Sequence, residues 1–318
     1  MNRGTVRALG LLAGFAADRV LGDPRRFHPV AGFGTVAGRL EKTIWADRRG
    51  RGAAYTAVLV GGTALAGAYA ERRATSPLAR GALTAVATWA VLGGRSLERE
   101  AAAVDAFLGR DDLPGARRRL THLVGRDTAH LSASDVSRAV IESVAENTSD
   151  AVVAPLVWGA VAGVPGLLGY RAANTLDAMV GHHNARFEHF GWASARLDDL
   201  LNLPGSRLSG ALTLLAAPTR AREAVRAWRR DAAAHPSPNA GVIEAAFAGS
   251  LGIHLGGTNT YYGHRVEHRA VMGRGPAPDP VHIGRAIGLA RRVDLGAALI
   301  AAGTAYTLGR LRSRKDHR

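Results

Sequence analysis

The most informative segment of this chain reads IESVAENTSD (residues 141–150), AVVAPLVWGAVAGVPGLLGY (151–170) and RAANTLDAMVGHHNARFEHFGWASARLDDLLN (171–202). Its middle part carries no charge, whereas both flanks are crowded with acids, amides and histidines. A soluble core would not surround twenty uncharged residues with so many polar side chains at helical spacing. Groups that handle a charged substrate at a bilayer face must lie at the ends of apolar segments. The pattern therefore favours a membrane enzyme.

The rest of the 318-residue chain has a similar segregation of charge. The mean hydropathy is −0.01, which also suits a soluble protein, but residues 53–70 carry no charge and residues 81–94 and 295–309 form shorter uncharged runs. Runs of about 18–20 apolar residues can cross a hydrocarbon core of ~30 Å, and Gly and Ala are common where membrane helices pack. We expect an all-α, polytopic integral membrane helical bundle. Buried helices of an Ala-rich soluble protein are the alternative.

The basic residues lie between these apolar runs. The formal charge of +15 comes mainly from arginine, clustered at residues 25–51, 220–230 and 310–315. This distribution is expected of cytoplasmic loops and of contact with anionic lipid, so we expect a multi-pass protein of the inner (cytoplasmic) membrane with a cytoplasmic active site. No aromatic-interleaved RNA motif accompanies the clusters, and no nucleic-acid partner is expected. The absence of cysteine excludes disulfides and thiolate chemistry.

Along its length the chain reads as a single membrane-embedded domain, residues 1–318, with helical cytoplasmic loops and almost no strand signals. Ser132 or Ser134 is the expected cap of the helix that runs through Glu142. If residues 151–170 crossed the membrane once, the two polar flanks would lie on opposite sides. The prolines and glycines within that run instead predict a broken or re-entrant segment that returns to the same face.

Three acids, Glu142, Glu146 and Asp150, stand at i, i+4 and i+8, within roughly 80° of arc on one helix face. Like charges at this spacing repel unless a cation holds them. Because hard divalent cations prefer oxygen ligands, the acids predict a Mg²⁺ or Mg-nucleotide site. A solvated acidic face is the alternative.

Arg171, Asn174 and Asp177 repeat at i, i+3 and i+6 and form a polar stripe. A cation, an amide and a carboxylate on one face suit phosphate or carboxylamide recognition, although they could equally form a satisfied network between membrane helices. Asp198 and Asp199 are paired acids near an expected helix end, which bind a cation or remain solvated.

Two further segments carry candidate polar residues. Asp23 and His28 lie in the GDP…HPV loop, whose tight turns could hold them at the membrane face. Asn239 begins the SPNAG..E segment as the expected helix cap, and Glu244 follows on the same helix. Each of these signals is weak alone.

Taken together, four ordered blocks resemble a known family. LGDPRRFHPV, ESVAENTSDAVVAPLVWG, NTLDAMVGHHNARFEHFGWASARLDDLLN and SPNAGVIEAAFAGSLGIHLGG are similar to the signatures of the CobD/CbiB family, the adenosylcobinamide-phosphate synthases of cobalamin biosynthesis. The resemblance covers about residues 8–310. It departs at Arg171, where the family often has Lys; Arg keeps the charge but not the point-charge geometry.

The resemblance implies a membrane enzyme that joins adenosylcobyric acid, through its free propionate, to (R)-1-aminopropan-2-ol or its O-phosphate. The product is adenosylcobinamide or its phosphate. Amide formation from a free carboxylate needs activation, for which ATP and Mg²⁺ are expected. A homo-oligomer, or a complex with other late cobalamin enzymes, would be compatible with this activity.

On this hypothesis the propionate is phosphorylated to an acyl phosphate and then attacked by the amine. Glu142, Glu146 and Asp150 would act as catalytic residues that hold Mg-ATP, and Asp198 and Asp199 would hold a second Mg²⁺. No Walker-type loop is present, so a conventional P-loop is excluded.

Arg171 would offset developing phosphoryl charge, and Asp177 or His28 would take the proton from the attacking ammonium. The residues expected to bind substrate are Asp23, Arg171, Asn174, Asn239 and Glu244.

Two alternatives belong to other functional classes. An AmpE-like membrane sensor or regulator would share the architecture without needing the full set of acids. A corrinoid transporter would also place polar residues beside broken membrane helices, but it would move its substrate without covalent change.

Overall fold

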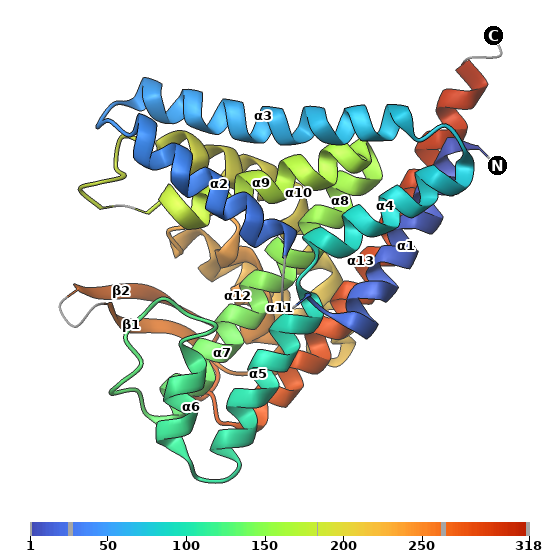
Figure 1. Cartoon of the computed structure of the whole chain (residues 1–318). Coiled ribbons are helices and arrows are strands. Elements are labelled where there is room, and N and C mark those ends of the chain that lie inside the picture. The colour runs from blue at the N-terminus through green and yellow to red at the C-terminus, as the bar shows by residue number, and fades with distance from the viewer. Residues whose placement is uncertain (1, 25–27, 183, 262–264, 316–318) are drawn as a thin grey trace. The chain divides into compact units, whose positions relative to one another are not determined.

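The computed structural model describes residues 2–24, 28–182, 184–261 and 265–315 (Figure 1). Helices dominate this part of the chain, which confirms the expected α-helical class. The chain forms two compact units that alternate along the sequence. The first comprises Met1–Gly93, Asp150–Gly205 and Ala297–Arg318, and the second comprises Gly94–Ser149 and Ser206–Gly296.

The first unit is a helical assembly in which α1 packs on α4, and α9 packs on α2, α3 and α8 (Figure 1). A Cβ atom on Gly4 would lie only 2.7 Å from Cα of Gly309, so the first helix of the chain packs directly on the last one. The elements of this unit are α1 (Arg3–Leu21), α2 (Pro29–Ile44), α3 (Arg49–Arg73), α4 (Pro77–Val91), α8 (Ala154–Ala162), α9 (Val164–Val180), the first part of α10 (Trp192–Ala216) and the last part of α13 (Val281–Lys315).

Local sequence signals fix the starts of these helices. Asn2 accepts a hydrogen bond from the Thr5 amide at 2.8 Å and caps α1. Ser76 caps α4, and Pro77 occupies its first turn, where a missing N–H costs nothing. The chain therefore turns sharply between α3 and α4.

The uncharged run at 151–170 is broken, as the sequence predicts. A π-helical turn (Ser149–Val153) leads into α8, and α9 begins after Gly163. Gly163 has φ +73°, a conformation that favours glycine. The nine residues of α8 extend about 14 Å, too short for a ~30 Å core. Residues 151–170 are thus two packed helices rather than one crossing.

The second unit encloses α7 and α12 in its core. Ile141 and Val144 of α7 and Ile243 and Phe247 of α12 are fully or almost fully buried in one apolar cluster. Ser132 caps α7 in a capping box with Asp135, which confirms one of the two predicted caps. The helices of this unit are α5 (Gly94–Leu108), α6 (Leu113–Leu120), α7 (Ala133–Thr148), α11 (Ala221–Asp231), α12 (Ala240–Leu251) and the remaining parts of α10 and α13.

A two-stranded antiparallel hairpin also belongs to the second unit, and the sequence analysis missed it. It consists of β1 (Leu255–Tyr261) and β2 (Arg265–Met272), with Leu255 paired to Met272 and a bulge between Leu255 and Gly257. A lone hairpin is marginal in water. The hairpin begins and ends in the core, where Leu255 and Met272 are completely buried, so tertiary packing stabilises it.

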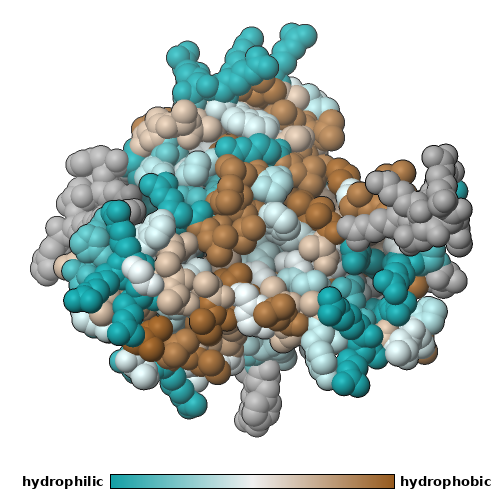
Figure 2. Space-filling view, turned by 90° about the horizontal axis from the view of Figure 1, so that it is seen from above, coloured by the Kyte–Doolittle hydropathy of each residue, from teal (hydrophilic) through white to brown (hydrophobic). Residues whose placement is uncertain are grey.

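Among the described residues, one helix is long and apolar enough to cross a membrane, namely α3. Only 22% of its most apolar window is buried, unlike the core helix of a soluble protein. The view from above shows hydrophobic side chains exposed at the surface (Figure 2). The expected run at 81–94 extends past the end of α4 at Val91, and the 15 residues of α4 extend only about 22 Å. The described residues therefore contain one helix that is long and apolar enough to cross a membrane, whereas the sequence predicts several.

Candidate functional site

The predicted site residues form two groups, one in each unit. Both groups lie where helices pack, and all of their side chains except that of Glu146 are partly or wholly removed from solvent. The second unit holds Glu142, Glu146, Asn239 and Glu244, and the first unit holds Asp23, His28, Asp150, Arg171, Asn174, Asp177, Asp198 and Asp199.

In the second unit Glu142, Glu146 and Glu244 form an acid cluster between α7 and α12. Glu142 is almost completely buried and both of its carboxylate oxygens have partners. Arg126 donates to one oxygen at 2.6 Å, and the Gly256 amide donates to the other at 2.9 Å. Arg138 lies 3.9 Å from Glu142 and donates to the Gly256 carbonyl. Glu142 therefore anchors the Arg126 loop and the start of β1.

The other two acids differ from Glu142. The Glu146 side chain is exposed, yet the protein around it displaces enough water to raise its pKa. Arg269 opposes this rise in the pKa of Glu146, and the charge of Glu142 adds to it. Glu244 is 1% exposed, and burial raises its pKa well above the ordinary range, with Glu142 and Glu146 adding to the shift. His235 lies 3.8 Å from one oxygen of Glu244.

The second oxygen of Glu244 has no hydrogen-bond partner among the described residues. A buried carboxyl group without a partner is costly when ionised. Burial therefore favours the neutral form of Glu244, whereas Arg269 and Arg126 favour its carboxylate.

Asn239 occupies the N-cap position of α12, as predicted, but its side chain makes no capping hydrogen bond. Its side-chain oxygen instead accepts hydrogen bonds from Ser206 at 2.9 Å and from Arg207 at 2.7 Å. The Ser237 hydroxyl accepts from the amides of Asn239 and Ala240 and takes over the capping role. Asn239 thus joins the start of α12 to α10.

The donor set can be compared with the needs of magnesium. Within the described ranges, no three His, Asp or Glu side chains converge to hold a metal ion by themselves. Mg²⁺ commonly uses one or two carboxylates and completes its shell with waters and substrate phosphates. Glu146 is open to solvent and Glu244 has an unpartnered oxygen, so these two acids fit Mg²⁺ bound together with a nucleotide. Glu142 fits less well because its oxygens are engaged.

In the first unit a polar network connects α9 and α10. Arg171 donates to the Asn174 side chain at 3.1 Å, and Asn174 donates to Asp198 at 3.3 Å. Asn202 donates to the other oxygen of Asp198 at 2.9 Å and accepts from the Tyr170 hydroxyl at 2.6 Å. The predicted stripe on α9 therefore continues to Asp198 across the helix pair.

The network holds a carboxyl group that titrates near neutrality. Burial raises the pKa of Asp198 to about 7, with the negative charge of Asp177 adding to the effect. Asn174 and Asn202 oppose the rise by hydrogen bonding. The charge of Asp177 disfavours a second negative charge on Asp198, so Asp198 keeps its proton at a pH where isolated carboxyl groups have lost theirs.

Asp199 and Asp150 have other surroundings. Asp199 lies 4.0 Å from Arg196, one turn away on α10. Asp150 lies in the π-helical turn between Ser149 and Val153, and its backbone carbonyl lies 2.9 Å from the Tyr170 hydroxyl, whose single proton it shares with Asn202. The predicted joint metal-binding roles of these acids remain predictions.

Arg171 has one buried guanidinium nitrogen, Nε, without a hydrogen-bond partner among the side chains and backbone described here. The side chain borders a cavity of about 200 Å³ lined mainly by apolar residues, including Phe33, Val91 and Leu168. Burial lowers the pKa of Arg171, and Tyr170 and Asp23 are the leading groups that oppose the shift. An anion in this cavity would meet a charge-assisted donor.

One ring nitrogen of His28 has a structural role. Its Nδ1 accepts a hydrogen bond from the Val30 amide at 3.2 Å and caps α2. The neutral ring then carries its proton on Nε2, which lies 3.6 Å from Asp23. His28 could accept a proton at Nδ1 only by giving up the cap.

Sequence reasoning missed several residues that shape these groups. Asn202 stands four residues after Asp198, a spacing that places both on one helix face and could have been noticed. Tyr170 precedes Arg171 but belongs to the uncharged run. Arg126 lies in a loop with no periodicity, so its contact with Glu142 has no local signal.

Comparison with known proteins gives a consistent assignment. Residues 11–290 match the family described as CobD/Cbib protein. The chain is 50% identical over 305 residues to "Cobalamin biosynthesis protein CobD" of Mycobacterium tuberculosis (strain ATCC 25618 / H37Rv), covering 94% of this chain and 96% of the relative.

More distant relatives carry the same name. That of Geobacter metallireducens is 47% identical over 265 residues, covering 80% of this chain and 83% of the relative. That of Rhodobacter capsulatus is 40% identical over 299 residues, covering 91% and 95% respectively. No solved structure shows significant similarity to the chain. Because the match spans most of the sequence, this chain belongs to the CobD/CbiB family.

Proposed function

We propose that this protein is an enzyme of cobalamin biosynthesis, an adenosylcobinamide-phosphate synthase. It would join (R)-1-aminopropan-2-ol, or its O-phosphate, to the free propionate of adenosylcobyric acid. Relatives named as cobalamin biosynthesis proteins match more than 90% of the chain at 40–50% identity, and this similarity carries the assignment.

The proposed reaction has two steps. A propionate oxygen attacks the γ-phosphorus of ATP, and ADP leaves. The amine nitrogen then attacks the acyl carbon, the bond to the phosphate oxygen breaks, inorganic phosphate leaves and one proton passes from nitrogen to a base. Such a sequence needs cation-binding acids, an anion-binding cation and a group that accepts a proton near neutral pH.

The acid cluster of the second unit is the proposed cation-binding group. Glu146 and Glu244 would hold Mg²⁺ with the nucleotide, and the metal would supply charge neutralisation at the phosphates. Glu142 is proposed to support them by fixing Arg126 and the start of β1. The raised pKa values of Glu146 and Glu244 support this role, because a bound cation offsets the charge that burial disfavours.

The polar network of the first unit is the proposed anion and proton site. The unpartnered Nε of Arg171 would attract the propionate or the phosphoryl group. Asp198, whose pKa is raised to about 7 by burial and further by the charge of Asp177, would accept the proton together with Asp177. His28 is less suited because its Nδ1 caps α2.

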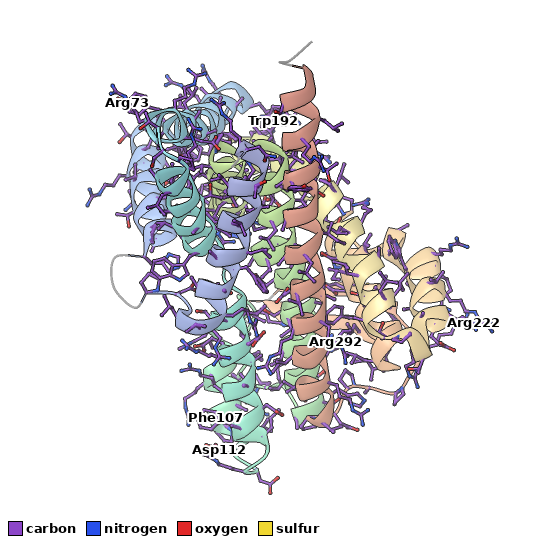
Figure 3. The ribbon with its side chains drawn as sticks, turned by 90° about the vertical axis from the view of Figure 1, so that its right-hand side faces the viewer. Arg73, Phe107, Asp112, Trp192, Arg222 and Arg292 are labelled. Carbon is purple, nitrogen blue, oxygen red and sulfur yellow. The ribbon has the colours of Figure 1, made fainter. Side chains whose placement is uncertain are left out.

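We also propose that the first unit lies in the inner membrane with more than one crossing. An arginine stacks on an aromatic ring at each end of α3. Arg49, at its start, lies over Trp192, and Arg73, at its end, lies over Tyr69. Arg73 is labelled in Figure 3. Such pairs are typical of membrane interfaces. Large apolar side chains are also exposed on other helices of this unit, namely Leu9, Val20, Leu78, Val86, Leu299 and Ile300.

The test is mass spectrometry of the detergent-solubilised full chain incubated with adenosylcobyric acid, aminopropanol O-phosphate and Mg-ATP. The expected product is heavier than the acid by aminopropanol phosphate minus water, with ADP released in equal amount. Omission of ATP should abolish it. Unchanged adenosylcobyric acid with folded protein would contradict the synthase, and transport into vesicles without covalent change would favour a transporter.

A further inference from the structure

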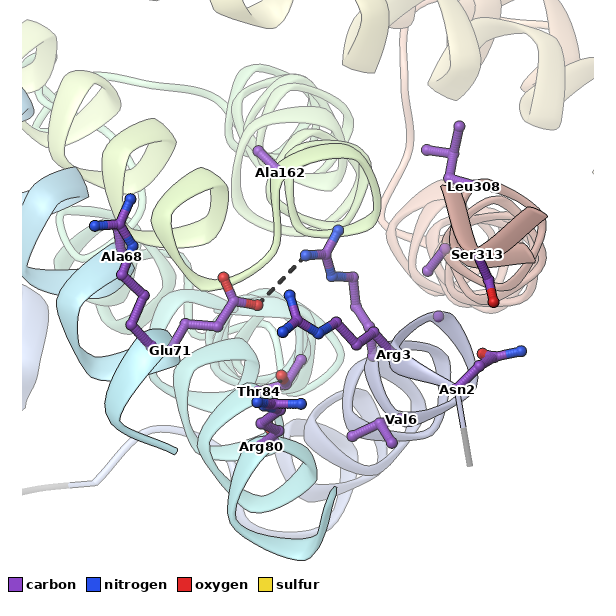
Figure 4. Close-up of a pocket in the computed structure, with 15 residues that line it drawn as sticks. Asn2, Arg3, Val6, Ala68, Glu71, Arg80, Thr84, Ala162, Leu308 and Ser313 are labelled. Atoms are coloured by element: carbon purple, nitrogen blue, oxygen red, sulfur yellow. Dashed lines mark hydrogen bonds and ion pairs between the residues drawn. The ribbon is translucent and has the colours of Figure 1, made fainter. Parts of the chain in front are cut away.

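The first unit contains a second polar region, at the end of the unit where α1 begins and α3 ends. A cavity of about 880 Å³ opens between α1, α3, α4, α8 and α13 (Figure 4). Its charged lining consists of four arginines and a single acid: Arg3, Arg7, Arg72, Arg80 and Glu71. None of these residues takes part in the proposed reaction.

One arginine of the cavity is committed to structure. Arg7 lies 3.3 Å from Glu71 and also donates to the carbonyl of Ala160 at 3.3 Å, near the C-terminal end of α8. A Cβ on Gly163 would lie 2.6 Å from Arg7, so the break between α8 and α9 packs against this arginine. Arg7 and Glu71 therefore neutralise each other and form one wall.

The other arginines supply uncompensated charge. Arg80 uses its Nε to donate to the Ala74 carbonyl at 2.7 Å, which leaves the two terminal nitrogens for another partner. Arg3 and Arg72 are exposed and make no hydrogen bond or ion pair with the described part of the chain. Figure 4 shows Arg3, Arg80 and Glu71 around the same space. The lining carries an excess of three positive charges.

The start of α1 adds to this field. Asn2 and Gly4 line the cavity, and the 19-residue helix begins at Arg3, so the positive end of its dipole is directed there. Guanidinium groups match phosphate oxygens in geometry as well as in charge. Three arginines gathered without acids would repel one another, which an anion relieves.

We propose that this cavity binds a phosphate-bearing anion. The phosphate can come from the headgroup of an anionic phospholipid or from a soluble phosphate compound, and the chemistry of recognition is the same. The site is distinct from the polar network: Gly163, which lies against Arg7 of the cavity, is the N-cap of α9, and Arg171 of the network stands eight residues further along, about 12 Å along the helix axis. The proposal does not depend on the amide synthase.

The test measures thermal unfolding of the full chain in a neutral, phosphate-free detergent. One arm titrates sodium pyrophosphate against sodium chloride at equal ionic strength. The other arm adds phosphatidylglycerol to the micelles, with phosphatidylcholine as its comparison. The expected result is a saturable rise in the unfolding temperature with pyrophosphate, with phosphatidylglycerol or with both, and the tighter-binding probe identifies the source.

The decisive variant is Arg3→Gln combined with Arg72→Gln. We expect its apparent affinity for the effective probe to fall by about tenfold or more, because two charge-assisted contacts are lost. The matched control removes two exposed arginines from α11, by Arg222→Gln and Arg229→Gln (Figure 3), and should bind as the wild type does. The variant Arg3→Lys with Arg72→Lys keeps the charge, and its affinity for the probe should lie between those of the glutamine variant and the wild type.

Two results would overturn the proposal. One is the absence of a saturable response to either probe in the wild type. The other is an equal affinity in the Arg3/Arg72 variant and the α11 control, which would mean that general positive charge, rather than this cavity, attracts the anion. Both glutamine variants change exposed side chains, so an unfolding temperature near that of the wild type without ligand is expected for each.

Discussion

Arg126 donates a 2.6 Å hydrogen bond to Glu142, and the two side chains are only 6% and 5% exposed. One partner comes from a loop and the other from the middle of α7. Removing one partner of a buried ion pair is costly, because the charge of the other partner then stays buried without compensation. Glu142 therefore matters for the stability of the second unit whatever its part in the reaction.

Arg126→Gln should lower the free energy of unfolding by about 3–5 kcal/mol, the usual cost of removing one partner of a buried ion pair. Chemical denaturation of the purified protein in detergent measures this loss. Arg119→Gln is the matched control, since Arg119 and Glu100 form a pair of the same length that is 35% and 27% exposed; its expected cost is about 0–1 kcal/mol. Equal losses in the two variants would contradict the structural role.

Glu146→Gln should abolish most of the amide synthase activity while the protein remains folded. We expect a decrease in kcat/KM of roughly 100-fold or more and a change in unfolding free energy below about 1 kcal/mol, because the side chain is exposed. Glu223→Gln, at an exposed acid of α11, is the control and should retain activity. Normal turnover by the Glu146 variant would remove the acid cluster from the mechanism.

Asp198 should make stability depend on pH. Its pKa is about 7 in the folded protein and about 3.9 in an unfolded chain, so the folded state binds a proton that the unfolded state releases. The stabilisation is complete below about pH 4 and is lost as the pH rises through 7.

Asp198→Asn removes this titration. The unfolding free energy of the wild type minus that of Asp198→Asn should therefore decrease by about 2–3 kcal/mol between pH 5 and pH 8, measured by denaturation at each pH. Asp199→Asn, beside the exposed Arg196, should not change the pH dependence. A constant difference for Asp198→Asn would show that the carboxyl group is ionised throughout this range.

The outer face of α3 should be covered by lipid. The chain has no cysteine, so Val58→Cys and Leu65→Cys each introduce a single thiol at a position that is 63% or 71% exposed in the protein alone. In opened membranes, a membrane-impermeant maleimide should leave both thiols unmodified, since a thiolate is disfavoured in an apolar medium. Thr121→Cys, exposed at the end of α6, should react. Rapid modification of the α3 positions would mean that water covers this face.

The sequence predicts those features that local chemistry determines. Ser132 caps α7 because a hydroxyl three residues before Asp135 satisfies free amides. The break at Gly163 follows from a residue that tolerates φ +73°. The contact between Arg171 and Asn174 follows from helical spacing.

Features that depend on distant partners could not be predicted in this way. Asn239 is a residue type that commonly caps helices, but its side-chain oxygen accepts hydrogen bonds from Ser206 and Arg207 instead. The two strands of the hairpin are too short to give a clear strand pattern in a mostly helical sequence. The ends of the hairpin are stabilised by packing in the core. The division of the acids between two units follows from the alternation of chain segments between these units, which leaves no mark on composition.

The direct packing of Gly4 on Gly309 has a consequence for biosynthesis. Synthesis proceeds at about 5–20 residues per second, so the N-terminal helix exists for roughly 15–60 s before its C-terminal neighbour is made. During that interval α1 depends on α4, against which it also packs. A chain that terminates before Ala297 would contain every predicted site residue and still leave this face of α1 without its partner.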